Sequence, residues 1–236
     1  MKFLVFQHHA AESPGVFIDL MRAADIPFDV VCLDDGAPIP ELSSYAALLA
    51  FGGPANVWEE DRFPWLVAEK AAIRDFVGEL RRPFLGICLG HQLLAEAFGG
   101  KVGPMQRTEA GLSQVRLTDA GRSDRLFHDL AEPVTAMQWH GAEVKTLPVQ
   151  GVTLAGNAAC PVQAFRLADN AYGLQFHIEV TATSIARWQR LPAYHQVIAE
   201  NRAEALEQEY SGASEMYLKA FRDTAATLFS RFRQLV

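Results

Sequence analysis

The segment Phe84-Leu85-Gly86-Ile87-Cys88-Leu89-Gly90-His91-Gln92-Leu93-Leu94 is the most informative part of this 236-residue chain. Its apolar first half is typical of a buried strand, and it ends in a turn of small residues around Cys88. Apolar residues then recur at helical spacing, at Leu93, Leu94 and Ala97. The segment therefore predicts a strand, a sharp turn and a helix.

The predicted position of Cys88 suits a reactive thiol. A sulfur at a helix N-terminus lies near the positive end of the helix dipole and near free N–H groups, which favour thiolate over thiol. Gly86 and Gly90 leave room for the helix to pack back on the strand, and the Leu89 N–H is free to donate to a developing oxyanion. This pattern indicates a nucleophile elbow, but a buried cysteine in an ordinary strand-to-helix turn explains it equally well.

A second segment, Tyr172-Gly173-Leu174-Gln175-Phe176-His177-Ile178-Glu179, predicts a strand that ends in His-x-Glu. Residues two apart in a strand point to the same face. His177 and Glu179 would then stand side by side, so that the carboxylate holds one ring nitrogen while the other faces a thiol. A base with an orienting acid is what a cysteine nucleophile needs. Either residue alone would be read as a core histidine or a solvated glutamate.

Together with Phe51-Gly52-Gly53-Pro54, the segments Gly86–Gly100 and Gln175–Glu179 resemble the class I (triad) glutamine amidotransferases. The similarity extends over residues 1 to about 180. The chain looks like a standalone relative of the amidotransferase domain of GMP synthetase. One difference is Ile178, because the family usually has proline there. Isoleucine suits an extended strand, so we expect a local backbone change and an intact triad.

The resemblance implies a role for each residue of the site. Cys88, His177 and Glu179 would form the catalytic triad. The backbone N–H groups of Leu89 and Gly53 would form the oxyanion hole. The glycines after the strand at 46–51 could equally form a plain tight turn, and only their pairing with the elbow favours the functional interpretation.

The resemblance also implies a substrate pocket that contains Gly52, Gln92, Trp139 and His140. A free amino acid needs partners for its charged groups, so buried polar side chains are expected near the elbow. Many relatives follow the His-Gly of this pocket with aspartate, whereas this chain has Ala142-Glu143. The polarity of the pocket and the choice of substrate are therefore open.

A metal site is an alternative for Cys88, His91, His177 and Glu179, because cysteine and histidine three apart on a helix can share one face. That alternative gives the elbow glycines no purpose, so we expect neither a metal nor another cofactor. The sequence contains no P-loop or dinucleotide fingerprint. Four more histidines have no partner that the sequence identifies: His8, His9, His128 and His195.

Composition limits the partners and the compartment. The chain has 21 basic and 28 acidic residues, a net charge of −7 and no basic cluster longer than Arg81-Arg82, so no nucleic-acid partner is expected. Three cysteines without paired spacing fit a reducing compartment. The apolar N-terminal run is too short for a signal peptide, and no run has the length of a membrane span. We therefore expect a cytoplasmic protein without membrane contact.

The order of apolar segments predicts an α/β fold. Buried strands are expected at 2–6, 28–33 and 46–51, with helices starting at Ser13-Pro14 and covering 65–80. Strand–helix–strand units give parallel pairs, whereas the short β segments between 101 and 172 indicate a mixed or antiparallel half. We predict a single three-layer, flavodoxin-like domain with a central, mostly parallel sheet, its active site at the carboxyl ends of the strands.

The C-terminal part is expected to be helical. Apolar residues recur there at helical spacing: Met216, Tyr217, Ala220, Phe221, Leu228, Phe229 and Phe232. Residues 1–190 would form the amidotransferase domain and 191–236 a helical extension packed on it. The alternative is that the apolar face forms a homodimer or partner surface, and the sequence does not separate the two.

Three functions follow from these residues. The first is a glutaminase that releases ammonia through a γ-glutamyl thioester on Cys88, for release or for a separate synthase subunit. The second keeps the triad but acts on γ-glutamyl amides, as a γ-glutamyl peptidase. The third is a non-catalytic regulatory or binding module, which is disfavoured because no triad residue is missing.

Overall fold

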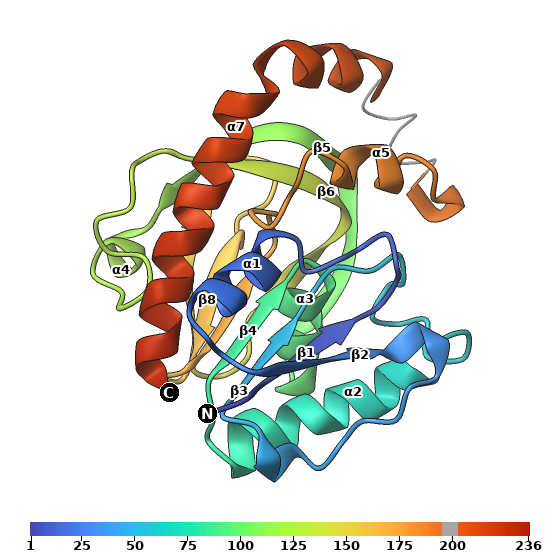
Figure 1. Ribbon diagram of the computed structural model, residues 1–236, viewed down its shortest axis with the longest axis vertical. Helices are drawn as coiled ribbons and strands as arrows, with labels where there is room; N and C mark the ends of the chain where they lie inside the picture. The colour runs from blue at the N-terminus through green and yellow to red at the C-terminus, as the bar shows by residue number, and fades with distance from the viewer. Residues whose placement is uncertain (195–202) are drawn as a thin grey trace.

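Strands from both halves of the chain form one sheet in the order β2-β1-β3-β4-β9-β8-β7-β5-β6 (Figure 1). The computed structural model describes residues 1–194 and 203–236. The strands there are β1 (Phe3–Gln7), β2 (Phe28–Cys32), β3 (Ala47–Ala50), β4 (Phe84–Ile87), β5 (Lys101–Leu117), β6 (Val134–Thr146), β7 (Gly151–Gly156), β8 (Ala164–Leu167) and β9 (Ala171–Leu174). Pairing is parallel from β2 to β9 and antiparallel beyond β9, which confirms the predicted mixed sheet.

Helices cover both faces of this sheet (Figure 1). They are α1 (Val16–Ala23), α2 (Trp65–Arg74), α3 (Leu89–Ala97), α4 (Asp119–Arg122), α5 (Ser184–Trp188) and α7 (Ala203–Phe232), with a π-helical turn at Asp75–Glu79 and 3-10 turns at Leu33–Asp35, Leu42–Ser44, Pro192–Tyr194 and Arg233–Leu235. β1 shows how the faces are divided. Phe3 and Val5 join the core under α1 and α7, whereas Leu4 and Phe6 join the core under α2 and α3. The period of two along the strand thus builds both cores.

Helix α1 begins later than Ser13-Pro14 predicts. Its N-cap is Gly15, with φ +53°, and the Val16 N–H donates to the Glu179 backbone oxygen at 3.0 Å. A Cβ at position 15 would lie 1.8 Å from that oxygen. The helix start is therefore fixed by a contact with a distant segment, which outweighs the local capping signal.

The β5–β6 ribbon is longer than the short segments expected from the sequence. β5 has 17 residues and β6 has 13, and they pair antiparallel with a register shift between Pro104 and Glu109. Much of β5 is exposed or half-buried and carries polar residues. Pairing between the two strands supplies its length, so no continuous apolar run was there to predict it.

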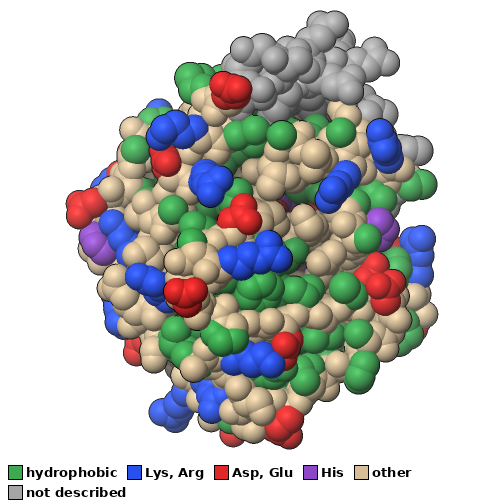
Figure 2. Space-filling view, in the orientation of Figure 1, with side chains coloured by type: hydrophobic (Ala, Val, Ile, Leu, Met, Phe, Trp, Pro, Cys, Tyr) green, Lys and Arg blue, Asp and Glu red, His purple; other side chains and the backbone are tan. Residues whose placement is uncertain are grey.

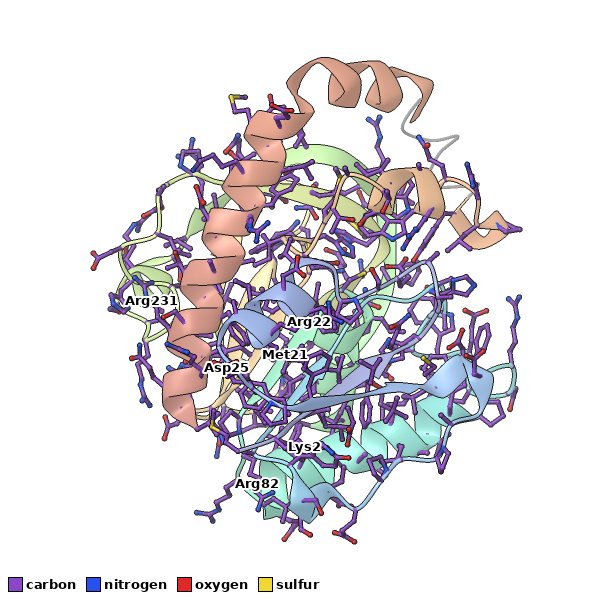
Figure 3. All side chains as sticks on the ribbon, in the orientation of Figure 1. Lys2, Met21, Arg22, Asp25, Arg82 and Arg231 are labelled. Atoms are coloured by element: carbon purple, nitrogen blue, oxygen red, sulfur yellow. The ribbon has the colours of Figure 1, made fainter. Side chains whose placement is uncertain are left out.

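Helix α7 packs along the sheet beside α1, with Phe221, Leu228, Phe229 and Phe232 buried (Figure 1). Met216 is 63% exposed, so its assignment to the apolar face was wrong. Figure 3 shows Arg231 on the α4 side of α7, where its Nη1 atom donates to the backbone oxygens of Leu126 and His128. We propose that residues 191–236 form one folding unit with residues 1–190.

Truncation of Phe229 tests that proposal. Its ring lies 6.3 Å from that of Phe3 and 6.0 Å from that of Phe17, centroid to centroid. Phe229→Ala should lower the free energy of unfolding by about 3–5 kcal/mol in a single transition followed by urea denaturation. Met216→Ala is the matched control and should change it by less than about 0.5 kcal/mol. A separate, early transition of α7 would contradict the proposal.

The glycines of the elbow leave no room for a side chain. A Cβ at Gly90 would lie 2.2 Å from the Ala50 oxygen, and one at Gly86 would lie 2.4 Å from the Gly90 backbone. We expect Gly90→Ala to destabilise the protein by more than about 2 kcal/mol, because the clash is with backbone of β3. Gly103→Ala is the control, since its Cβ would meet only the Lys145 side chain at 3.6 Å. Equal urea midpoints for the two variants would contradict this expectation.

Charges are mixed on the surface. Figure 2 shows acidic and basic side chains interspersed over the face that it draws, with neither sign gathered into a patch. Within residues 1–194 and 203–236, no helix combines the length and the apolar character needed to cross a membrane.

Candidate active site

The predicted strand, turn and helix around Cys88 are present. β4 ends at Ile87, and Cys88 is the N-cap of α3 with φ +53° and ψ −103°. The left-handed region is strained for a residue with a Cβ. The Cys88 N–H is held by the Leu174 oxygen at 2.7 Å, and the residue is 5% exposed. The turn thus fixes the cysteine where the sheet meets the helix N-terminus.

Sheet topology brings His177 to the same place. β4 and β9 are parallel neighbours, with Ile87 opposite Leu174, so both chains leave the sheet at the same edge. β9 ends at Leu174, and the prediction that the strand continues to Glu179 was wrong. Instead, His177 exchanges two backbone hydrogen bonds with Met137 of β6, at 2.8 and 3.1 Å. This isolated bridge holds the histidine outside the strand.

His177 and Glu179 still meet. The Nδ1 atom of His177 lies 2.5 Å from Oε1 of Glu179, and both side chains are buried. The other carboxylate oxygen accepts the Ile178 N–H at 3.0 Å. Proline has no N–H, so the isoleucine at this position adds a hydrogen bond that proline could not make. Both oxygens of Glu179 are therefore occupied by donors from its own segment.

The surroundings of His177 favour its protonated form. Burial alone would lower the pKa of His177, but the negative charges of Glu179 and Cys88 raise it well above the ordinary value. The Nε2 atom is buried and has no hydrogen-bond partner among the described residues. That nitrogen is therefore available to take a proton from a neighbouring thiol and to return it to a leaving group.

The two glycines after β3 lie on either side of the site. Gly53 lines the same cavity as Cys88 and Leu89, and a Cβ on it would lie 2.9 Å from the Leu89 side chain. Gly52 is not among the lining residues of that cavity. A Cβ on Gly52 would meet Glu12 Oε2 at 2.8 Å and His177 Cε1 at 3.3 Å. Gly52 therefore lies behind the histidine.

A cavity of about 370 Å³ opens at the elbow, which is within the usual size range of small-molecule sites. Six residues of the predicted site line it: Gly53, Cys88, Leu89, Gln92, Trp139 and His140. Gln92 Nε2 donates to Gln175 Oε1 at 3.1 Å and to the Ala142 oxygen at 3.3 Å. His140 Nδ1 lies 3.0 Å from the same oxygen of Ala142. Glu143 does not line the cavity and pairs with Lys145 instead.

Three side chains at the site were not found from the sequence. Trp188 of α5 packs on His177, with ring centroids 4.8 Å apart. Tyr194 lines the cavity beside Trp139, and its hydroxyl donates to the buried Glu12. No motif marks these residues, because they come from loops and from the segment after β9. Their apolar and acidic letters would fit any surface helix or loop.

Burial gives Glu12 a distinctive titration. Burial raises the pKa of Glu12 from 4.5 to about 7, although His177 and the Tyr194 hydroxyl act to lower it. Because this folded-state pKa lies above the unfolded value, the folded protein binds more protons between the two values. Stability should therefore fall as pH rises through this window.

The substitution Glu12→Gln should remove this dependence. Relative to wild type, the variant should gain roughly 2–3 kcal/mol of unfolding free energy between about pH 5 and about pH 8. Urea denaturation at both pH values measures the difference, in which the other titrating groups cancel. Glu79→Gln, at an exposed position, is the control and should show no such gain. A constant difference between Glu12→Gln and wild type would contradict the assignment.

The histidines outside the triad differ in their partners. His8, for which the sequence identifies no partner, is paired with Glu69. His91 is buried and packs edge-on against Phe165, with centroids 4.9 Å apart; burial lowers its pKa to about 3. His128 Nδ1 lies 3.1 Å from the Asp124 oxygen. Of the remaining two, His9 Nδ1 accepts the Ala11 N–H at 3.0 Å, and His195 lies outside the described residues.

A sequence model of the family described as glutamine amidotransferase class-I matches residues 16–187. The chain belongs to this family. The match covers the elbow, the histidine–glutamate pair and the glycine turn, and it confirms the resemblance seen in the sequence.

Relatives of this amidotransferase chain include both separate subunits and larger enzymes. A glutamine-hydrolysing GMP synthase subunit from Thermococcus kodakarensis is 40% identical over 114 residues, 48% of this chain and 59% of that one. A glutamine amidotransferase-like protein of Salmonella typhimurium is 31% identical over 183 residues, 75% of each chain. The chain spans between 24% and 59% of the length of the first three GMP synthase relatives.

The fold of a known amidotransferase matches nearly the whole chain. The crystal structure of a glutamine amidotransferase from Thermotoga maritima superposes with a TM-score of 0.85 and 26% identity, over 98% of this chain and 97% of that one. The similarity includes the C-terminal part, and it confirms the predicted α/β class with C-terminal helices.

Proposed function

We propose that this protein hydrolyses the side-chain amide of glutamine, with Cys88 as the nucleophile and His177 and Glu179 as base and orienting acid. The observation that carries the proposal is the meeting of these three residues at one cavity. Cys88 lies in a strained elbow, His177 responds electrostatically to Cys88, and Glu179 lies 2.5 Å from the far ring nitrogen. Family membership makes an amidotransferase activity the first expectation.

The reaction would proceed in two halves. Sγ of Cys88 attacks the amide carbon, and the oxyanion that forms accepts hydrogen bonds from the N–H groups of Leu89 and Gly53. His177 Nε2 takes the thiol proton and gives it to the nitrogen as the C–N bond breaks, so that ammonia leaves. Water, deprotonated by the same nitrogen, then attacks the γ-glutamyl thioester and releases glutamate and the free thiol.

The polar groups around the cavity would hold the substrate. Gln92 and His140 are tied to the Ala142 oxygen, which fixes their orientation, and Trp139 supplies an apolar wall. Gly52 supports the site from behind His177. The ammonia would go to a separate synthase subunit or into solution, as the name of the Thermococcus relative suggests for that protein.

A second candidate acts on γ-glutamyl amides larger than glutamine. The cavity continues from Cys88 to Met105, Gln106 and Thr108 of β5, which leaves space for a leaving group larger than ammonia. The chemistry and the triad would be the same. A panel of γ-glutamyl dipeptides distinguishes this candidate from a glutaminase.

The test is release of glutamate from the purified full-length chain. Glutamine turnover faster than dipeptide turnover supports the glutaminase, and the opposite order supports the peptidase. Absence of glutamate release from glutamine and from every dipeptide would contradict both. A thiol probe that labels Cys32 or Cys160 in preference to Cys88 would also count against them.

A further inference from the structure

His8 lies directly after β1, at the back of the Gly52-Gly53 turn. Its side chain is buried, with Nδ1 3.2 Å from the Gly52 oxygen and Nε2 2.9 Å from both carboxylate oxygens of Glu69. The Trp65 ring stacks on the imidazole at 5.2 Å. Three elements therefore fix this ring: β1, α2 and the turn after β3.

Both ring nitrogens of His8 face oxygen atoms that can only accept. A carbonyl oxygen and a carboxylate are satisfied together only when both nitrogens carry a proton. Burial alone would lower the pKa of His8, but the charge and hydrogen bond of Glu69 and the Gly52 carbonyl raise it. The ring is thus an imidazolium whose Nδ1–H donates to Gly52.

The Gly52 oxygen and the Gly53 N–H belong to one peptide group. A trans peptide is planar, so its C=O and N–H point in opposite directions. Holding the oxygen toward His8 therefore turns the Gly53 N–H away from His8. Gly53 is enclosed between His8 and Leu89, since a Cβ on it would lie 2.7 Å from His8 Cβ and 2.9 Å from Leu89 Cδ2. Its N–H donates to no backbone oxygen within residues 1–194 and 203–236.

We infer that His8, held by Glu69, is a positioning residue that locks the Gly52–Gly53 peptide with its N–H facing the cavity at Cys88. The inference rests on the proposed function, in which this N–H receives the oxyanion. Two consecutive glycines have wide backbone freedom, so the peptide would turn without an anchor. A preset donor costs no reorganisation as the oxyanion forms, whereas a free one must first be oriented.

Two substitutions of similar size separate the two ends of the ring. In His8→Asn, the amide nitrogen can replace Nδ1 and keep the donor for Gly52. In His8→Gln, the amide reaches toward Glu69 and the donor to Gly52 is lost. We expect His8→Gln to lower kcat by about 10- to 100-fold and His8→Asn by less than about threefold, with KM little changed in both.

A second readout excludes general damage to the site. Alkylation of Cys88 by iodoacetamide forms an S–C bond as iodide leaves and develops no oxyanion. Its rate should therefore be the same in wild type and in both variants. Equal loss of kcat in the two variants, wild-type kcat in His8→Gln, or slowed alkylation parallel to kcat would each overturn the inference.

A measurement on the folded protein separates this inference from the proposed function. If wild type hydrolyses no γ-glutamyl substrate, the proposed function fails, and NMR still tests the lock. The ¹⁵N-labelled wild type should show a slowly exchanging His8 Nδ1–H, and the Gly53 amide shift should move in His8→Gln and stay in His8→Asn. The wild-type signal needs no variant to fold, and its absence would overturn the inference.

Discussion

Replacement of Cys88 by alanine is expected to reduce glutamine hydrolysis by about 10⁵- to 10⁶-fold, to the background rate. The thioester cannot form without the sulfur, and neither His177 nor the oxyanion donors supply another nucleophile. The fold should survive, because alanine removes only one atom at a position that is 5% exposed. Glutamate release measures activity, and thermal unfolding checks the fold.

Cys32→Ala is the matched control for this substitution. Cys32 is a free cysteine at the end of β2, half-buried and outside the cavity, so its replacement should leave kcat within about twofold. Retention of more than about one hundredth of wild-type activity in Cys88→Ala would refute the thioester mechanism. Capture of the γ-glutamyl enzyme by mass spectrometry should succeed only when Cys88 is present.

Glu179→Gln is expected to lower kcat by about 10³- to 10⁴-fold at unchanged size. Both carboxylate oxygens accept hydrogen bonds, one from His177 and one from the Ile178 N–H. Glutamine has a single acceptor oxygen, so its NH₂ group must face one of these two donors. Either the Ile178 N–H loses its acceptor, or His177 adopts the wrong tautomer. The negative charge that raises the His177 pKa is also lost.

Glu12→Gln is the control that separates charge from contact. Glu12 is buried near His177 and interacts with it electrostatically, but its hydrogen-bond donor is Tyr194. We expect this variant to lose less than about tenfold in kcat, because the orientation of the imidazole is retained. Equal losses in the two variants would show that negative charge alone, and not the 2.5 Å contact, is what Glu179 provides.

Local sequence was sufficient for features that depend on short-range sterics. The turn at Cys88 needs glycine at positions 86 and 90, because the helix passes within contact distance of β3 and β4. The buried strands of the parallel half were found because both of their faces are covered by helices, which gives continuous apolar runs. Pairing of His177 with Glu179 was expected from a strand, but an isolated bridge to Met137 produces it.

Features that depend on distant contacts were missed or misplaced. α1 starts at Val16 because Glu179 approaches Gly15, and no local signal marks that approach. The partner of His8 comes from α2, and Tyr194 reaches Glu12 from the segment after α5. Polar residues of this kind carry no periodicity, so their meeting cannot be derived from spacing.

The amino-acid sequence by itself determined the family, the α/β class and the candidate nucleophile, base and acid, because each is encoded by adjacent residues whose spacing has one good structural solution. The tertiary structure alone decided which groups surround them. Parallel pairing of β4 with β9 places Cys88 beside His177, and packing of β1, α2 and the glycine turn places His8 behind Gly53. Contacts of this second kind depend on how strands and helices stack, and that is a property of the whole core.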